Sequence, residues 1–324
     1  MTTTDTPGLP TLPTPLVDSG DRVNAAAAVR AMRWLMGEPG HALPGDRALA
    51  MRLRNALPWV VRSLELQRQF LFRSTELFRR RLGIDQFITF SAGPYRPWPG
   101  LAADLQLPCT AVPDAAAFVH VNVLTATGES GHPCGHRHTD ARFTKMLPLL
   151  RHPALTDLDR HRPIGVLVDD IGPLTDSTAD LQFGLDRLRE WLPPGSAIAL
   201  VHSTTGLLPT AGRAAVEARR DFAARLVTQA TGRPYRLRSR AEIAQLLKGW
   251  PPGNLDQPVA AGNFFSDGLP QLPDHHSGAY AVMALHSLHP DYAKDPNYTP
   301  GGPTHGTARS VPEQATGGEQ AGAS

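Results

Sequence analysis

Short apolar runs alternate with longer amphipathic stretches through the middle of the chain, and this alternation constrains the fold most strongly. Residues 86–90, 163–168 and 197–201 have the length and composition of buried strands. Residues 178–191 and 211–230 have the apolar spacing of helices. Strands that alternate with helices predict βαβ units and a mostly parallel sheet, so the fold class is α/β.

The remaining segments extend this pattern on both sides. We expect further strands at 117–124 and 279–285, and a helix that a capping box opens at Ser239 and Glu242. N-terminal helices are expected at 22–36, 45–57 and 59–81.

Composition excludes several functional classes. The 324 residues carry a formal net charge of +2, which gives no basic face for nucleic acid. No run approaches the roughly 18 apolar residues of a membrane span. The only cysteines are Cys109 and Cys134, too few for a disulfide scaffold, and the N-terminus does not resemble a signal peptide. We therefore expect a cytoplasmic protein with neither a nucleic-acid nor a membrane partner.

Polar residues at the carboxyl ends of the predicted strands are the candidate catalytic groups. In an open α/β sheet, ligands bind at this edge, which draws attention to the loops after Phe90, Val121 and Val168. Asp169 and Asp170 could provide a general base or a cation contact, or could form an Asx turn. His202 could be a catalytic base or a structural histidine.

A histidine-rich segment, 132–138, is the most conspicuous local cluster. It contains His132, Cys134, His136 and His138, but their spacing fits no standard zinc pattern. We expect a polar loop here and no metal site.

Several short motifs occur in the order and spacing of one known family, and the chain resembles the bacterial S-adenosyl methyltransferases that were formerly a domain of unknown function. The resemblance runs from about residue 22 to 286. It depends on Trp34-Leu35-Met36-Gly37, Asp46-Arg47, Gln67-Arg68-Gln69-Phe70-Leu71, Ile84-Asp85-Gln86-Phe87, Arg162-Pro163-Ile164, Pro194-Gly195-Ser196, His202 and Arg238 to Ile243.

The resemblance implies a Rossmann-like class I methyltransferase sheet with an N-terminal helical cap. The corresponding division of the chain is a disordered segment at 1–20, a helical cap at 21–82, a Rossmann-like domain at 83–287 and a disordered tail at 288–324. It also implies S-adenosylmethionine as cofactor and a small-molecule substrate. A homodimer is left open.

The implied cofactor site departs from the family pattern. The family's Asp-Leu-Gly-Thr-Gly loop corresponds to Thr89-Phe90-Ser91-Ala92-Gly93, which has lost the acid and the first glycine. The acid at the end of the second strand, which binds the ribose hydroxyls, corresponds to Asn122. The acid that recognises the adenine amine is retained as Asp140.

Neutral residues therefore stand at two of the three positions where the family has a cofactor-binding carboxylate, and we expect weakened or lost cofactor binding. Three hypotheses follow. The protein is a methyltransferase with an unusual cofactor loop, a non-catalytic binding or regulatory relative, or an enzyme that reuses the pocket for other chemistry such as cyclisation. Filling of the pocket by Phe90, Tyr95 and Trp98 would favour the second.

Overall fold

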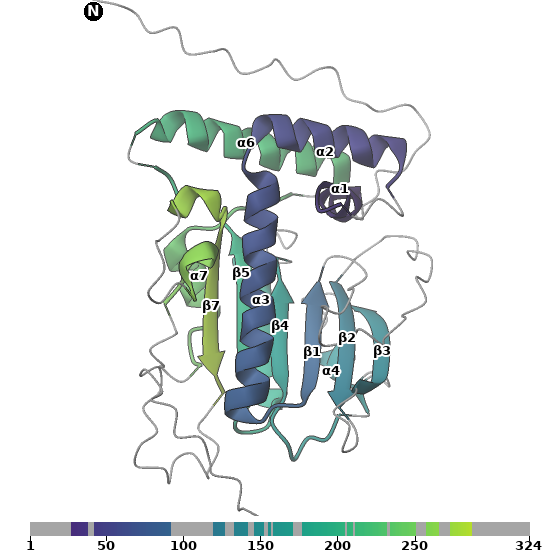
Figure 1. Cartoon of the computed structure of the whole chain (residues 1–324). Coiled ribbons are helices and arrows are strands. Elements are labelled where there is room, and N and C mark those ends of the chain that lie inside the picture. The colour runs from purple at the N-terminus through teal and green to yellow at the C-terminus, as the bar shows by residue number, and fades with distance from the viewer. Residues whose placement is uncertain are drawn as a thin grey trace, which may run out of the picture.

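A seven-stranded open sheet with helices on both faces forms the centre of the molecule (Figure 1). The computed structural model describes residues 27–37, 42–91, 119–126, 133–141, 146–151, 155–156, 158–170, 177–204, 206–209, 211–231, 234–250, 257–265 and 273–286. The order of the strands across the sheet is β3-β2-β1-β4-β5-β7-β6. Their bounds are β1 (Gln86–Ser91), β2 (Val119–Ala126), β3 (Pro133–Ala141), β4 (Gly165–Asp169), β5 (Ala197–Ser203), β6 (Val259–Ala260) and β7 (Ala279–Leu285).

The three central strands confirm the predicted βαβ core. β1 pairs in parallel with β4, and β4 pairs in parallel with β5. The prediction of a mostly parallel sheet is wrong for the flanking pairs, because β2 runs antiparallel to β1 and β3, and β7 runs antiparallel to β5 and β6.

The antiparallel direction of β2 changes where two predicted features lie. Asn122 does not end its strand: it lies inside β2, opposite Thr89 of β1. The carboxyl end of β2 is at the opposite edge of the sheet, so the loop after this strand is not beside those after β1 and β4.

The histidine-rich segment 132–138 was expected to be a loop, and this is wrong for residues 133–138, which belong to strand β3. β3 pairs with β2 over most of its length, which satisfies its backbone groups on that side. It is the last strand of the sheet, and edge strands of natural proteins often have polar sequences.

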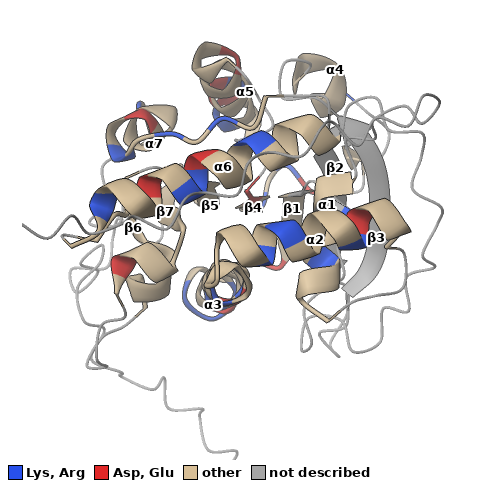
Figure 2. Cartoon of the chain, turned by 90° about the horizontal axis from the view of Figure 1, so that it is seen from above, with Lys and Arg blue, Asp and Glu red and all other residues tan. Residues whose placement is uncertain are grey.

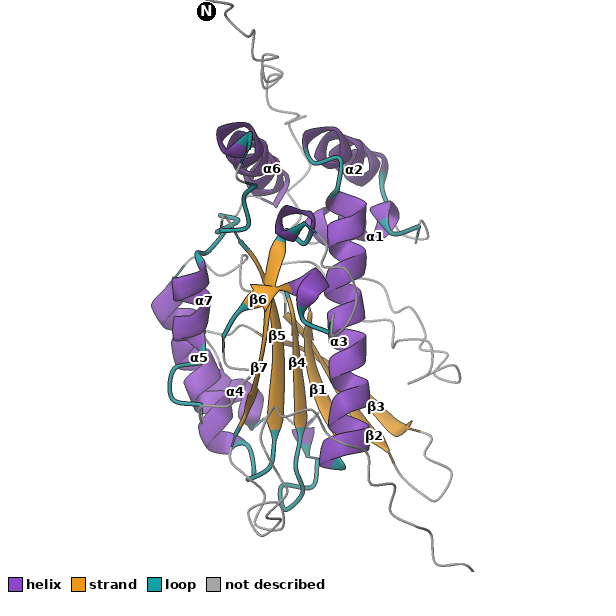
Figure 3. Ribbon diagram, turned by 60° about the vertical axis from the view of Figure 1, so that its left-hand side comes forward, coloured by secondary structure: helices purple, strands orange, loops and turns teal. Residues whose placement is uncertain are grey.

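Helices cover both faces of the sheet (Figure 3), and each set packs on it through its own hydrophobic core. On one face, α3 (Val60–Leu82) packs Phe70, Leu71 and Phe78 against β1, β4, β5 and β7. On the other face lie α4 (Met146–Leu150), α5 (Thr178–Trp191) and α7 (Arg240–Leu246). The predicted capping box at the start of α7 is confirmed: Ser239 Oγ accepts from the Glu242 amide, and Glu242 accepts from the Ser239 amide.

A third layer of helices lies beyond the carboxyl ends of β1, β4 and β5. It consists of α1 (Ala27–Leu35), α2 (Pro44–Ala56) and α6 (Arg213–Thr231), which share a separate apolar core (Figures 1 and 2). A buried ion pair joins α1 to α2, where Arg30 Nε and Nη2 donate to Asp46 at 2.6 and 3.0 Å. None of the described helices combines the length and apolar composition needed to cross a bilayer.

Gly165 is the position in the central sheet where a side chain is least tolerated. A Cβ on this residue would lie 2.4 Å from Phe87 Cδ1 and 3.3 Å from Ile84 Cγ2, and both neighbours are buried. We expect Gly165→Ala to lower the free energy of unfolding by about 1–3 kcal/mol through overpacking. Chemical denaturation measures this. Gly45→Ala is the control, because its Cβ meets nothing within 4 Å and should be neutral or slightly stabilising; equal stability of both variants would contradict the packing.

Candidate active site

Asp170 occupies an unusual backbone position at the carboxyl edge of the sheet. It follows the last residue of β4 and has a φ of 44°, the only left-handed non-glycine residue among those described. Such conformations cost free energy and persist where the surroundings enforce them. The positive φ turns the Asp170 side chain toward the end of the neighbouring strand β5.

Three hydrogen bonds from two residues hold the Asp170 carboxylate. The Ser203 amide donates to Oδ1 at 2.6 Å, and the Ser203 hydroxyl donates to Oδ2 at 2.7 Å. The Tyr235 hydroxyl donates to Oδ2 at 3.1 Å and also lies 3.2 Å from Ser203 Oγ. Oδ1 thus accepts a single bond from the described residues, which leaves it an acceptor position for a ligand.

Burial controls the protonation of this group. Burial raises the pKa of Asp170 to about 7; the bonds from Ser203 and Tyr235 lower it, and the negative charge of Asp169 raises it. Burial likewise raises the pKa of Asp169 to about 6, against the opposing effect of Arg68. Near neutral pH, Asp170 can therefore both accept and release a proton, as acid–base catalysis requires.

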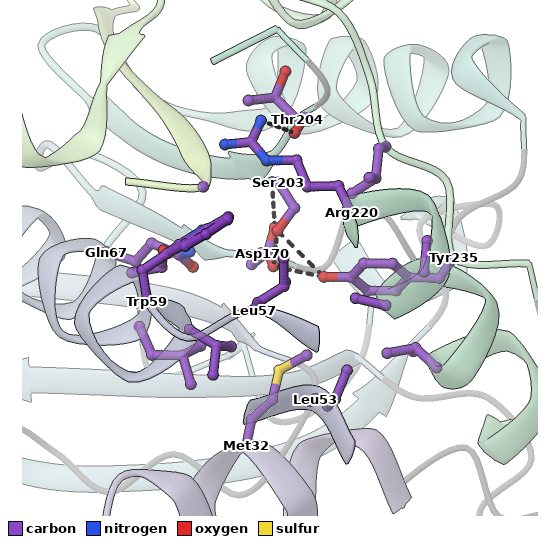
Figure 4. Close-up of a pocket in the computed structure, with 18 residues that line it drawn as sticks. Met32, Leu53, Leu57, Trp59, Gln67, Asp170, Ser203, Thr204, Arg220 and Tyr235 are labelled. Carbon is purple, nitrogen blue, oxygen red and sulfur yellow. Dashed lines mark hydrogen bonds between the residues drawn. The ribbon is translucent and has the colours of Figure 1, made fainter. Parts of the chain in front are cut away.

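A cavity of about 80 Å³ lies between Asp170 and the outer helices (Figure 4). Tyr235 points toward Asp170 on one side, and Trp59 and Gln67 lie on the other (Figure 4). Most of the wall is apolar and comes from α1, α2, α3 and α6. These residues are Met32, Leu53, Val60, Leu64, Ala223, Ala224 and Val227, and Leu57 after α2 and Leu237 before α7 add to the same apolar wall.

Arg220 of α6 adds a buried positive charge to the same cavity. It is 4% exposed, and it donates to the carbonyl oxygens of Thr204 and His275, each at 3.1 Å. Burial lowers the pKa of Arg220 to about 10, so the guanidinium remains charged at neutral pH.

His202 is placed differently from Asp170. Its side chain is fully buried, its Nδ1 lies 2.6 Å from the Ser203 carbonyl oxygen, and its Nε2 lies 3.0 Å from Arg238 Nη1. Burial and the charge of Arg238 lower the pKa of His202 to about 3. Both ring nitrogens are occupied, so this geometry favours the structural alternative for His202 over the catalytic one.

Known proteins resemble the chain in both sequence and fold. The sequence profile of the S-adenosyl methyltransferase family, Methyltransf_19, matches residues 19–258. The chain belongs to this family. No curated protein matches it.

Two solved structures share the fold of this family member. A putative methyltransferase from Thermobifida fusca YX is 17% identical, with a TM-score of 0.56, over 80% of this chain and 94% of its own. A DUF574 family protein from Streptomyces avermitilis MA-4680 is 20% identical, with a TM-score of 0.56, over 82% of this chain and 99% of its own. The Rossmann-like class I methyltransferase fold predicted from the sequence is thereby confirmed.

Two of the predicted cofactor residues, Ser91 and Asp140, lie level with the end of β4, next to Asp170. Ser91 pairs with Asp169 on one side and with His120 on the other, and His120 pairs with Asp140. The backbones of Ser91, Asp140 and Asp169 are thus level across the sheet. Ala92 and Gly93 lie outside the described residues, as do Tyr95 and Trp98. The cofactor roles of Ser91, Ala92, Gly93, Asn122 and Asp140 stay predictions.

Phe90 does not fill the cavity. Its side chain is buried in the core on the α5 face of the sheet and is not part of the cavity wall. No group of three or more His, Cys, Asp or Glu side chains in the described part of the chain could hold a metal ion.

Sequence reasoning missed Ser203, Tyr235 and Arg220. Arg220 carried a usable signal, because it shares the apolar face of α6 with Ala223 and Val227 at helical spacing. A charged residue on a buried stripe is unusual and requires a partner. Ser203 and Tyr235 carry no such signal, since only the fold brings them to Asp170.

Proposed function

We propose that the protein methylates a small molecule with S-adenosylmethionine, that Asp170 accepts the proton of the methylated group, and that cofactor affinity is weakened. The observation that supports this most is the Asp170 carboxyl group, which lines a cavity at the carboxyl edge of a methyltransferase-type sheet. Such edges are where open α/β sheets bind ligands.

The proposed reaction releases a proton, which a carboxylate beside the acceptor can take. Bound S-adenosylmethionine supplies an electrophilic methyl group, and an acceptor hydroxyl or amine must lose a proton as it is alkylated. Asp170 Oδ1 has room for that proton, while Ser203 and Tyr235 keep the carboxyl group in one orientation. Met32, Leu53 and the other apolar residues of the outer helices would exclude water from the acceptor.

The described residues fit the cofactor only in part. Thr89 occupies the position of the family's first-strand acid and is buried at 1% exposure, so no carboxylate is available there. Asp169 ends the adjacent strand, two residues further toward the edge, and carries a carboxyl group whose pKa is about 6. It therefore compensates only in part for the missing first-strand carboxylate.

Weak cofactor binding is a measurable expectation. Each lost charged hydrogen bond costs roughly 1.5–3 kcal/mol, so two lost bonds weaken binding by about two to four decades. We expect calorimetric titration with S-adenosylmethionine and S-adenosylhomocysteine to give affinities weaker than micromolar. Asn122→Asp should tighten binding by about tenfold or more, and Asp140→Ala should abolish it. Micromolar binding by the unmodified protein would contradict the expectation.

Reuse of the pocket for other acid–base chemistry is the second candidate. The cavity of about 80 Å³ is smaller than the roughly 300–1,000 Å³ of typical ligand sites, while Asp170, Ser203 and Tyr235 converge on it. Mass spectrometry of reaction products separates the candidates, because methyl transfer adds about 14 mass units and a cyclisation or rearrangement adds none.

A further inference from the structure

We propose that Arg220 binds the carboxylate of the substrate, and that the substrate is a small acid whose compact apolar or aromatic body fills the cavity beside Asp170. This names the substrate class for the proposed function and relies on that function for the reaction. The binding itself can be measured without any cofactor.

The partners of Arg220 are the first observation. The guanidinium has five N–H donors, and the described residues accept from two of its nitrogens, through the carbonyl oxygens of Thr204 and His275. No carboxylate within the described part of the chain lies within ion-pair distance of it. Asp170, which lines the same cavity, accepts hydrogen bonds from Ser203 and Tyr235 among the described residues.

Arg30 provides an internal comparison. It is also buried and also belongs to the outer helices, but it makes a two-point ion pair with Asp46. A buried charge lowers stability unless it is paired, and Arg30 is paired with Asp46 of the same chain. The described residues give Arg220 carbonyl acceptors but no carboxylate, and an anionic ligand in the cavity would supply the missing charge.

The shape of the cavity defines the rest of the ligand. Arg220 and Asp170 both contribute to its wall, and Figure 4 shows the Arg220 guanidinium beside Thr204, across Ser203 from Tyr235. The remaining wall is mainly aliphatic, with Trp59 as an aromatic surface. A planar guanidinium favours two-point recognition of a carboxylate, and an apolar wall favours a hydrocarbon body.

Direct binding of a matched pair of probes tests the proposal. We would titrate the cofactor-free full chain with 4-hydroxybenzoate and with 4-hydroxybenzamide, which share a ring and hydroxyl and differ in charge. The unmodified protein should bind the acid roughly 10- to 100-fold more tightly than the amide. Arg220→Gln should remove that preference, and Arg220→Lys should retain part of it. Arg225→Gln, an exposed position on the same helix, should leave it unchanged.

The outcomes separate a binding role from a structural one. If Arg220 only fastens the Thr204 and His275 carbonyls, Arg220→Gln will lower the melting temperature while the acid keeps its advantage, and the proposal fails. Binding of neither probe by the unmodified protein, or equal binding of both, also overturns it. If Arg220→Gln fails to fold, the proposal is tested by the preference of the unmodified protein for the acid over the amide and by its partial retention in Arg220→Lys. Tight acid binding without methyl transfer would count against the proposed function alone.

Discussion

Asp170→Asn is expected to lower kcat for methyl transfer by about 10²- to 10⁴-fold, the usual contribution of a positioned general base. Asparagine has nearly the same shape and tolerates the left-handed backbone at φ 44°, so the fold should survive. Its carbonyl oxygen can still accept from the Ser203 amide, and its amide can donate to the Ser203 and Tyr235 hydroxyl oxygens. The measurement uses tritiated S-adenosylmethionine with an acceptor that the unmodified protein methylates.

The pH dependence gives this prediction a second readout. The basic form of Asp170 is the active one, so kcat/KM should rise as pH increases through about 7, and the rise should vanish in Asp170→Asn. The Tyr235 hydrogen bond lowers the pKa of Asp170, so Tyr235→Phe should move the rise to higher pH. Asp180→Asn, an exposed change at the start of α5, is the control. A loss of less than threefold in Asp170→Asn would rule out its role as the base.

The central fold was predictable because its signals are local. β1, β4, β5 and α5 come from contiguous apolar runs and helical spacing, and the α7 start comes from one capping box. The direction of β2 was not predictable, because parallel and antiparallel strands can have the same composition. A helix in the preceding connection would have indicated a parallel strand, but the sequence before β2 contains no clear helical pattern. β3 was missed because an edge strand needs no apolar alternation.

The sequence also predicted only the part of the site that depends on local signals. Asp169 and Asp170 follow a recognisable strand, and the rule for ligand sites in α/β sheets draws attention to them. Which of the two enters the cavity depends on the backbone of one residue, because the positive φ of Asp170 directs its carboxyl group to Ser203. The contact with Tyr235 joins residues 65 positions apart, which sequence spacing does not reveal.

The outer helices that form one side of the cavity wall depend on the buried Arg30–Asp46 pair, and Arg30→Met is expected to lower the free energy of unfolding by about 3–5 kcal/mol. The two side chains are 10% and 3% exposed, and without Arg30 the Asp46 carboxylate stays buried and, among the described residues, keeps a hydrogen bond from the Leu43 amide but no positive charge. Urea denaturation followed by circular dichroism and by tryptophan fluorescence measures the loss, and a separate early transition would locate it in α1 and α2.

Two further variants separate the effect of the unpaired charge on stability from the effect of lost packing contacts. Arg62→Met removes an ion pair whose side chains are 46% and 42% exposed, and it should cost no more than about 1 kcal/mol because water already screens that pair. The double variant Arg30→Met with Asp46→Leu replaces both charges by apolar groups and should recover most of the lost stability, since the penalty arises from the unpaired carboxylate. If the double variant is as unstable as Arg30→Met, the cost arises from packing between α1 and α2 rather than from charge. If the double variant recovers, the outer layer obeys the charge-pairing rule, and among the described residues Arg220 has no carboxylate that satisfies this rule, which supports an anionic ligand in the cavity.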